Sequence, residues 1–404
     1  MTRPIRQLAV VCGLACALLL AASPLALAGP GRASILADPD QMLIELYKDL
    51  GARHLRDAMA KADKLVATFP NFQLGHLLRG DLLLMQTQEV DRFGAVDGAA
   101  PQALADLRQE AVARMKALLE RPDPARVPRA VIQLRPDQRK VLVVDARRSR
   151  LYVYENRQGE LHFQRDFYIS QGKLGVNKEK EGDQKTPLGV YYITGRLAGS
   201  RLPDLYGVGA LPISCPNEWD KLHGRDGSGI WLHGTPARNY SRPPLSSDGC
   251  VVLTNPDLRV VYGSIEVGKT PVVIAGEADF VPRAQVAEER ARAQAMVEGW
   301  RAALEDPDPQ RLRSKYSSHF RTEQGENLDD WLARQRKQTE ALVKPSMALR
   351  SLSLFRYPGR DEVLVATFTV DAVSGSKRVS NRKRQYWALE SGAWKVVSES
   401  SWQG

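Results

Sequence analysis

Cysteine is scarce in this chain, which has four cysteines among 404 residues. Two of them, Cys12 and Cys16, lie in an apolar stretch near the N-terminus, so only Cys215 and Cys250 belong to the rest of the sequence. Two cysteines cannot build the disulfide framework of a small extracellular scaffold. One disulfide between Cys215 and Cys250, or two free thiols, are the alternatives that this count leaves open.

Several recognisable binding sequences are also missing. The chain has no glycine-rich phosphate loop, no Walker sequence and no cluster of cysteines and histidines at metal-ligand spacing. We therefore expect no metal and no cofactor. No nucleic-acid-binding motif is recognisable either, so the formal net charge of +10 does not predict a nucleic-acid partner. A basic surface favours solubility or attraction to an anionic polymer.

The first 28 residues have the pattern of a secretory signal peptide. Arg3 and Arg6 make a positive start, residues 8–20 are apolar, and Ala26-Leu27-Ala28 suits cleavage. Loss of the two arginines would change the formal charge from +10 to +8 (10 − 2), so the mature protein would stay basic. We predict export to the periplasm rather than permanent anchoring in a membrane.

The remaining chain is too long for one core and is predicted to form a multidomain α+β protein. Residues 29–122 are rich in helix-forming sequence with apolar residues at helical spacing, in a tetratricopeptide-like pattern. This region would serve a homodimer or a protein partner, or only pack as an appendage. Residues 123–138 are Pro-rich and charged, which indicates a linker. Residues 139–277 alternate short β-branched runs with turn residues and predict a β-dominated domain.

The most informative pattern in the central region pairs His233 with Cys250. Residues 229–233 have the pattern of a buried strand that ends on an imidazole, and residues 237–245 that of a polar loop. Asp248-Gly249 then predicts a tight turn that leads the thiol into a second apolar run. A thiol needs a neighbouring base to act as a nucleophile near neutral pH, so the pair predicts a cysteine enzyme. A catalytic Cys250 must stay reduced, hence we expect Cys215 to be free.

Two glycines beside this pair have predicted roles of their own. The carbonyl of Gly234 would hold the His233 imidazole in the tautomer that a base requires. The backbone N–H groups of Gly249 and Cys250 would face a developing oxyanion. Ser247 and Tyr206 are predicted to contact the substrate.

The segments around this pair resemble the L,D-transpeptidase (YkuD-type) catalytic domain family over roughly residues 139–276. The resemblance rests on a hairpin-like start, a Thr-Pro-x-Gly strand entry and the two catalytic segments: residues 141–155, Lys185–Ile193, His233-Gly234-Thr235 and Ser247-Asp248-Gly249-Cys250-Val251. It implies that Cys250 is acylated by a peptidoglycan stem peptide and that His233 is its base. The sequence around Ala210–Ser214 is similar to the branch that includes murein L,D-carboxypeptidases of cell-shape control.

Two positions depart from the family pattern. The family has a histidine before the Gly-Cys and an arginine two residues after the cysteine, where this chain has Asp248 and Val252. That arginine helps to hold a substrate carboxylate in the family, so acceptor choice is in doubt here. Arg238 or Arg242, in the loop before the cysteine, could replace it as a bidentate clamp, or be solvated loop charges.

The resemblance implies an exported L,D-transpeptidase that acts on tetrapeptide stems in cell wall remodelling and cell shape. Alternatives that use the same residues are an L,D-carboxypeptidase that trims tetrapeptides to tripeptides, and an amidase that releases a murein-bound envelope protein. An inactive cell-wall binding protein is the alternative of another class. Peptidoglycan stem peptides are the expected partner in each case.

Residues 282–404 are predicted to form a third domain. Helical sequence is followed by strand-like runs, which indicates an α+β domain. The order resembles the cone-shaped nuclear-transport-factor-like fold, in which a curved sheet wraps helices around a pocket. We expect this domain to bind a ligand of unknown identity.

Overall fold

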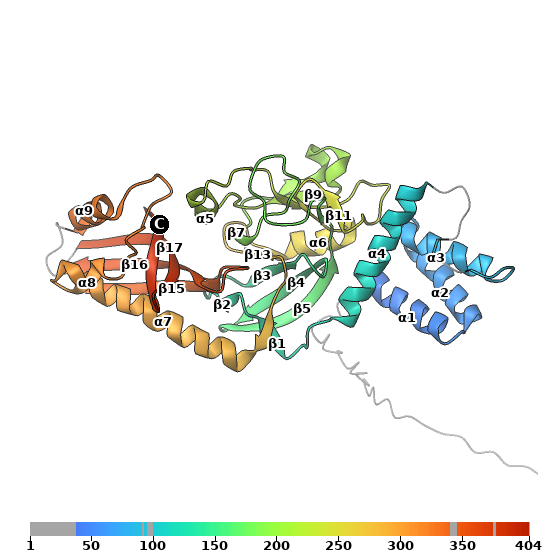
Figure 1. The fold of residues 1–404 in the computed structure, drawn as a ribbon, viewed down its shortest axis with the longest axis horizontal. Helices are drawn as coiled ribbons and strands as arrows, with labels where there is room; N and C mark the ends of the chain where they lie inside the picture. The colour runs from blue at the N-terminus through green and yellow to red at the C-terminus, as the bar shows by residue number, and fades with distance from the viewer. Residues whose placement is uncertain (1–37, 91–92, 95–99, 340–345, 375–376, 404) are drawn as a thin grey trace, which may run out of the picture. The chain divides into compact units, whose positions relative to one another are not determined.

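The computed structural model describes residues 38–90, 93–94, 100–339, 346–374 and 377–403. The predicted signal peptide, residues 1–28, lies outside the described residues. Figure 1 shows the helices of the N-terminal region, the strand-rich centre and the C-terminal sheet in chain order. The predicted multidomain α+β arrangement is confirmed.

The N-terminal region is helical, as predicted. Its helices are α1 (Pro39–Gly51), α2 (Leu55–Thr68), α3 (Gln73–Leu84) and α4 (Pro101–Leu119). In α2, Ala58, Ala62 and Leu65 recur at spacings of four and three residues and are all fully buried, so that they line one face of the helix. They share a core with Phe72 of the turn before α3.

The central region is built on two sheets. The larger has the strand order β5-β4-β3-β13-β7. Its strands are β3 (Lys140–Asp145), β4 (Arg150–Arg157), β5 (Glu160–Tyr168), β7 (Gly189–Tyr192) and β13 (Pro271–Ala275). The smaller has the order β12-β10-β9-β8. Its strands are β8 (Leu197–Ala198), β9 (Gly209–Pro212), β10 (Trp231–His233) and β12 (Val251–Val252).

Short elements surround these two sheets. β6 (Gln171–Gly172) pairs with β11 (Leu245–Ser247), and the helices are η1 (Gly199–Arg201), η2 (Asp204–Tyr206), α5 (Glu218–Leu222) and α6 (Asn255–Ser264). Leu142 of β3, Leu232 of β10 and Leu258 of α6 belong to one buried core. This apolar core fixes β10 and β12, which carry the predicted catalytic residues.

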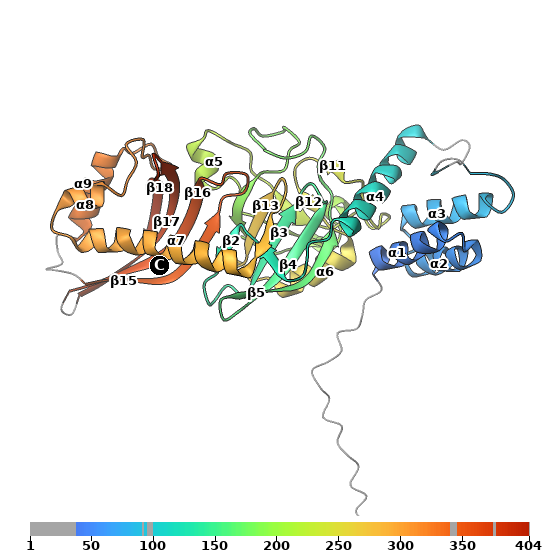
Figure 2. The same ribbon diagram turned by 60° about the horizontal axis from the view of Figure 1, so that its bottom comes forward.

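The C-terminal region places helices on one side of a sheet (Figure 2). The helices are α7 (Arg283–Glu305), α8 (Pro309–Arg313) and α9 (Leu328–Thr339). The sheet has the order β18-β17-β16-β15-β2, with β15 (Ser346–Arg356), β16 (Val363–Ser374), β17 (Lys377–Glu390) and β18 (Ala393–Gln403). Trp300 of α7 packs on Phe368 of β16, with ring centroids 5.4 Å apart.

Residues 123–138 differ from the predicted linker. They contain β1 (Arg126–Pro128), which pairs with β14 (Phe280–Pro282), and β2 (Val131–Gln133), which is the edge strand of the C-terminal sheet. Pro128 hid β1 in the sequence, because proline argues against a strand. It is tolerated here because it lies at the end of β1, where its missing N–H removes no hydrogen bond between the strands.

None of the helices among the described residues carries an apolar run long enough to cross a membrane.

Candidate active site

The register of β10 and β12 puts His233 and Cys250 on one face of the smaller sheet. The two strands are parallel neighbours, and His233 lies opposite Val252. Because side chains alternate between faces, Cys250, two residues before Val252, shares the face of His233. The Trp231 N–H donates to the Cys250 Sγ at 3.4 Å, and the thiol lies 3.6 Å from the Gly229 carbonyl oxygen. The thiol therefore sits beside the start of β10, and the imidazole at its end.

The His233 imidazole is fixed in one tautomer. Its Nδ1 lies 2.7 Å from the Gly234 carbonyl oxygen. A carbonyl oxygen only accepts hydrogen bonds, so Nδ1 carries the proton and Nε2 keeps its lone pair. Burial, helped by the nearby Arg242 charge and opposed by the Gly234 carbonyl, lowers the His233 pKa to about 4. The imidazole is therefore neutral and basic at Nε2 at neutral pH.

The Cys250 thiol is also held in its neutral form. Burial raises its pKa, and the N–H of Trp231 opposes that rise by donating to the sulfur. The Asp248 carboxylate adds to the rise, whereas the Arg242 and Lys178 cations reduce it. Both pKa shifts favour the neutral thiol and the neutral imidazole over their charged forms.

The turn before the thiol uses the Ser247 hydroxyl, predicted to contact substrate, and the Gly249 N–H, predicted to face the oxyanion. The Ser247 hydroxyl donates to the Cys250 carbonyl at 2.6 Å and accepts the Gly249 N–H at 3.1 Å. The single Ser247 proton is thus used inside the turn, and the Gly249 N–H does not point at a free oxyanion position. The structure places Ser247 and Gly249 as supports of the turn.

Glycine at 249 is required by both space and conformation. Its φ is +125°, and a Cβ there would lie 2.8 Å from the Lys185 carbonyl oxygen. The Thr186 hydroxyl donates to the Gly249 carbonyl at 2.9 Å. The Thr-Pro strand entry, which the sequence had placed far from the cysteine, therefore supports the catalytic turn directly.

Tyr206 lies against the imidazole. Its ring centroid is 5.0 Å from that of His233 and 4.9 Å from that of Trp231. Its backbone carbonyl accepts the Gly234 N–H at 3.1 Å. The half-buried Tyr206 ring therefore forms a wall beside the base, next to the face on which a substrate would lie.

Asn255 is a site residue that sequence reasoning missed. Its side chain donates to the Thr235 carbonyl at 2.8 Å and accepts the Val208 N–H at 3.0 Å. A Cβ at Gly234 would lie 2.2 Å from the Asn255 Oδ1, so glycine lets the segment after His233 approach α6. The sequence feature that could have pointed to Asn255 is the helix-capping residue Thr254, which directly precedes it.

Of the two loop arginines, only Arg242 reaches the catalytic pair. Its charge acts on both His233 and Cys250, and its guanidinium donates to the Ser246 carbonyl. The Tyr168 and Ser170 hydroxyls each donate to the Arg242 carbonyl at 2.9 Å. Arg238 is exposed. The structure therefore brings Arg242, but not Arg238, to the position where a substrate carboxylate could be held.

Lys178 is a second cation that the sequence did not single out. Its side chain is buried and its Nζ lies 2.8 Å from Asp183. Three backbone N–H groups, from residues 179, 180 and 185, also donate to the Asp183 carboxylate. Residues 178–185 are therefore tied into one loop whose cation acts on the Cys250 thiol.

Cys215 and Cys250 are both free thiols in the structure. Burial, with a contribution from Asp220, raises the pKa of Cys215 to about 12. A thiol with that pKa is a poor nucleophile at neutral pH. The described residues also contain no group of three or more His, Cys, Asp or Glu side chains arranged to hold a metal ion.

The C-terminal region has a cavity of its own. It has a volume of about 580 Å³ and lies between α7, α8, α9 and the sheet, with Arg313, Arg336, Asn381 and Lys383 among its lining residues. This cavity is the place where the predicted ligand of the C-terminal domain would bind, and that ligand stays a prediction.

The central region has the sequence pattern of an L,D-transpeptidase-type catalytic domain, and an NTF2-like accessory domain follows it. Residues 139–274 match the YkuD family, described as the L,D-transpeptidase catalytic domain, and residues 292–400 match the Cds6 C-terminal NTF2-like domain. The predicted recognition of both domains is confirmed.

Among solved structures, this chain is similar to Bd1075 of Bdellovibrio bacteriovorus, with a TM-score of 0.61 and 24% identity over 69% of this chain and 99% of that chain. It is also similar to the helical cell shape determining protein Pgp2 of Campylobacter jejuni, with a TM-score of 0.57 and 21% identity over 68% of this chain and 95% of that chain. At these identities the likeness shows a shared fold. No curated protein matches this chain.

Proposed function

We propose that this protein is an exported, cysteine-dependent L,D-transpeptidase that acts on the tetrapeptide stems of peptidoglycan. The observation that carries the proposal is the pairing of Cys250 with an imidazole whose Nδ1 proton is held by the Gly234 carbonyl at 2.7 Å. A base with its free lone pair on the same sheet face as a thiol is the arrangement that acyl transfer requires.

Acylation would proceed from the neutral pair. As the Cys250 sulfur attacks the carbonyl carbon of the L,D-peptide bond, its proton moves to Nε2 of His233. A carbon–sulfur bond forms, and the carbonyl oxygen becomes an oxyanion beside the Cys250 N–H. When the intermediate collapses, the carbon–nitrogen bond breaks and His233 returns the proton to the amine of the departing D-alanine. The product is a thioester on Cys250.

The second half-reaction decides which enzyme this is. An amine from a neighbouring stem would give up a proton to His233 and attack the thioester. The carbon–nitrogen bond of the cross-link forms, the carbon–sulfur bond breaks and His233 returns the proton to the Cys250 sulfur, which is transpeptidation. Water in the same position would release a tripeptide, which is the carboxypeptidase outcome. The same thioester chemistry applied to an amide-linked envelope protein would be the amidase outcome.

We propose that Arg242 takes over the role of the family arginine, whose position is occupied by Val252 in this chain. The stem ends in a free carboxylate, and a guanidinium is matched to a carboxylate in shape and charge. The charge of Arg242 already acts on both catalytic groups, so a carboxylate bound there would lie next to the reacting bond. Tyr206, whose ring packs against His233, would bound the same space.

The setting of this reaction is proposed from two further features. The pattern of residues 1–28 supports export to the periplasm, where peptidoglycan stems are accessible. The fold shared with a protein named for determining helical cell shape supports a role in cell wall remodelling and cell shape.

The test is mass spectrometry of the mature protein after incubation with purified disaccharide-tetrapeptides. Cys250→Ala should abolish turnover with an unchanged melting temperature, and Cys215→Ala should leave turnover intact as the matched control. A dimer joined between diamino acids would support transpeptidase activity. Tripeptide plus D-alanine would show that the protein is a carboxypeptidase instead. If neither product appears and no acyl adduct forms on Cys250, the hypothesis of an enzyme fails. The protein would then be an inactive cell-wall binding protein.

A further inference from the structure

The loop between His233 and Cys250 is held by the N-terminal helical region. Asn71, in the turn before α3, donates through its side chain to the Ala237 carbonyl at 3.1 Å, and its own carbonyl accepts the Tyr240 N–H at 3.3 Å. The Tyr240 ring packs between Phe69 and Phe72, with centroids 4.9 and 5.1 Å apart. Tyr240 is therefore part of the helical core, although it belongs to the catalytic loop.

A second set of contacts links α4 to the next two residues of the loop. The Ser241 hydroxyl donates to Glu110 at 2.7 Å, and the same carboxylate oxygen accepts Nε of Arg114 at 2.9 Å. The Arg114 guanidinium lies 3.9 Å from the centroid of the Tyr168 ring. Tyr168 in turn donates through its hydroxyl to the Arg242 carbonyl. Glu110 of α4 thus contacts Ser241 directly, whereas Arg114 is linked to Arg242 only through Tyr168.

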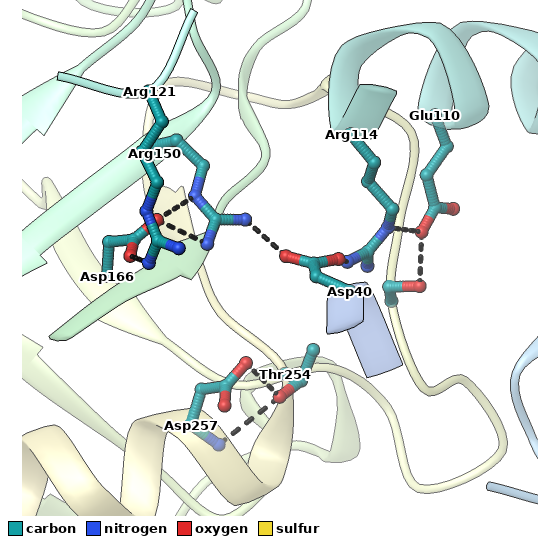
Figure 3. Close-up of polar contacts among 9 residues, drawn as sticks. Asp40, Glu110, Arg114, Arg121, Arg150, Asp166, Thr254 and Asp257 are labelled. Atoms are coloured by element: carbon teal, nitrogen blue, oxygen red, sulfur yellow. Dashed lines mark hydrogen bonds and ion pairs between the residues drawn. The ribbon is translucent and has the colours of Figure 1, made fainter. Parts of the chain in front are cut away.

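Buried ion pairs hold α4 in place. Asp40 of α1 bridges Arg114 and Arg150, and Arg150 donates through Nε to Asp166 at 2.8 Å (Figure 3). Burial alone would raise the Asp40 pKa, but the two arginines outweigh it and lower the pKa to about 2. Breaking one partner of a buried pair leaves an uncompensated charge, so such a network permits few alternative placements of the helix.

The loop has little support from strands of its own. Residues 237–244 form no helix or strand. The guanidinium of Arg242 donates to Ser246, only four residues further along the same chain. The Arg242 carbonyl is held by the Tyr168 and Ser170 hydroxyls of the central region, whereas the two residues before it, Tyr240 and Ser241, are anchored on the helical region.

We propose that Tyr240 and Ser241 are positioning residues, through which the N-terminal helical region places the Arg242 guanidinium beside the Cys250 thiol. The inference deepens the proposed function, because it assigns the helical region to the carboxylate-recognition side of the same site. At this face the helices contact the enzyme's own loop, and the homodimer or protein partner of the helical region stays a prediction.

The experiment measures where the Arg242 charge lies without requiring turnover. Cys250 in the full chain is alkylated with iodoacetate, an anion, or with iodoacetamide, its neutral analogue, and the rates are read by mass spectrometry of the Cys250 peptide. The anion-to-neutral rate ratio should fall about fivefold in Arg242→Ala, because a unit charge close to the thiol no longer attracts the anion.

Tyr240→Ala should lower this ratio as far as Arg242→Ala does, whereas Tyr240→Phe, which keeps the ring, should match the wild type. The double variant Tyr240→Ala with Arg242→Ala should show no further fall, since residues that act through one group are not additive. Ser241→Ala removes only the hydrogen bond to Glu110 and should lower the anion-to-neutral rate ratio by a smaller factor. It replaces Tyr240→Ala as the test variant if Tyr240→Ala does not fold.

A ratio that stays at the wild-type value in both Tyr240→Ala and Ser241→Ala would overturn the proposal, as would a double variant whose loss is the product of the two single losses. An unchanged ratio in Arg242→Ala would overturn it too. Alkylation needs no substrate, so these outcomes are distinct from failure to form an acyl-enzyme, which would overturn only the transpeptidase function.

Discussion

At the scale of single residues, burial is the force that sets the chemistry of this site. His233 is 3% exposed, and removal of water from the imidazole disfavours its cationic form. Removal of water from the Cys250 thiol disfavours the thiolate in the same way. In the proposed mechanism the base is thereby ready to accept a proton at neutral pH, and the charges would form only as the sulfur attacks.

The pH profile of acylation should show this directly. The protonated form of His233 cannot accept the thiol proton, so kcat/KM should fall on the acid side with an apparent pKa of about 4, below the ordinary value of about 6.5. Initial rates of acyl-enzyme formation between pH 3 and pH 8 are the measurement. An acid limb near pH 6.5 would show that the imidazole is not held neutral by its surroundings.

At the scale of elements, short strands and capped helices bring the site together. β10 has three residues and β12 has two, so neither could be stable without the core beneath them. α6 begins immediately after this pair, and Thr254 caps it by accepting the Asp257 N–H at 3.2 Å. The Asp257 carboxylate also accepts the Thr254 hydroxyl at 2.7 Å (Figure 3). The capped end of α6 thus adjoins the segment that follows His233.

Asp257 makes this helix end sensitive to pH. Burial, opposed by the Thr254 hydroxyl, raises its pKa from 3.8 to about 6. A carboxyl whose folded pKa is raised binds a proton on folding, so the free energy of unfolding falls as pH rises from about 4 to about 6, by up to roughly 3 kcal/mol. Asp257→Asn should avoid this loss. Its melting temperature should exceed that of the wild type at pH 7.5 and match it at pH 4.

Thermal melts of the two proteins at both pH values are the measurement. Thr254→Val, which removes the cap and keeps the carboxylate, is the control and should be destabilised at either pH. A wild type that is more stable than Asp257→Asn at pH 7.5 would mean that the helix dipole and the arginines nearby outweigh burial.

At the scale of the whole molecule, the catalytic and C-terminal regions share a core. Val143 and Trp219 of the catalytic region lie in the same buried cluster as Phe355 and Tyr386 of the C-terminal sheet. Glu218 of α5 also pairs with Arg384 of β17 at 2.8 Å. These regions therefore fold against one another rather than as modules joined by a linker.

Deletion of residues 282–404 should for this reason unfold the catalytic domain as well. The six buried members of the shared core that lie in residues 282–404 are Val286, Phe355, Tyr357, Val363, Val365 and Tyr386. Burial of each is worth about 1.5–3 kcal/mol, and their sum is comparable with the total stability of a typical domain. We expect an aggregated product or a much lower melting temperature, whereas Gln310→Ala on the C-terminal cavity wall should melt like the full chain. A truncated protein with normal melting and acylation would contradict the shared core.

Local sequence was sufficient for the order of the three regions, though not for the two short strands in residues 123–138, and it predicted His233 and Cys250 as the catalytic pair. Helical spacing, alternation and turn residues predicted the three regions, and the segments around His233 and Cys250 predicted the chemistry, because these signals act over a few neighbouring residues. The Gly234 carbonyl was also a local inference, since it belongs to the next residue along the chain.

Tertiary structure alone decided which partners each side chain meets. Ser247 and Gly249 bond to each other inside the turn, and residues 131–133 join a sheet formed some 220 positions later. Asp40 and Tyr240 come from distant segments that share no local pattern. Hydrogen bonds, buried charges and packing between such segments depend on the folded path of the chain, and no periodicity in the sequence encodes that path.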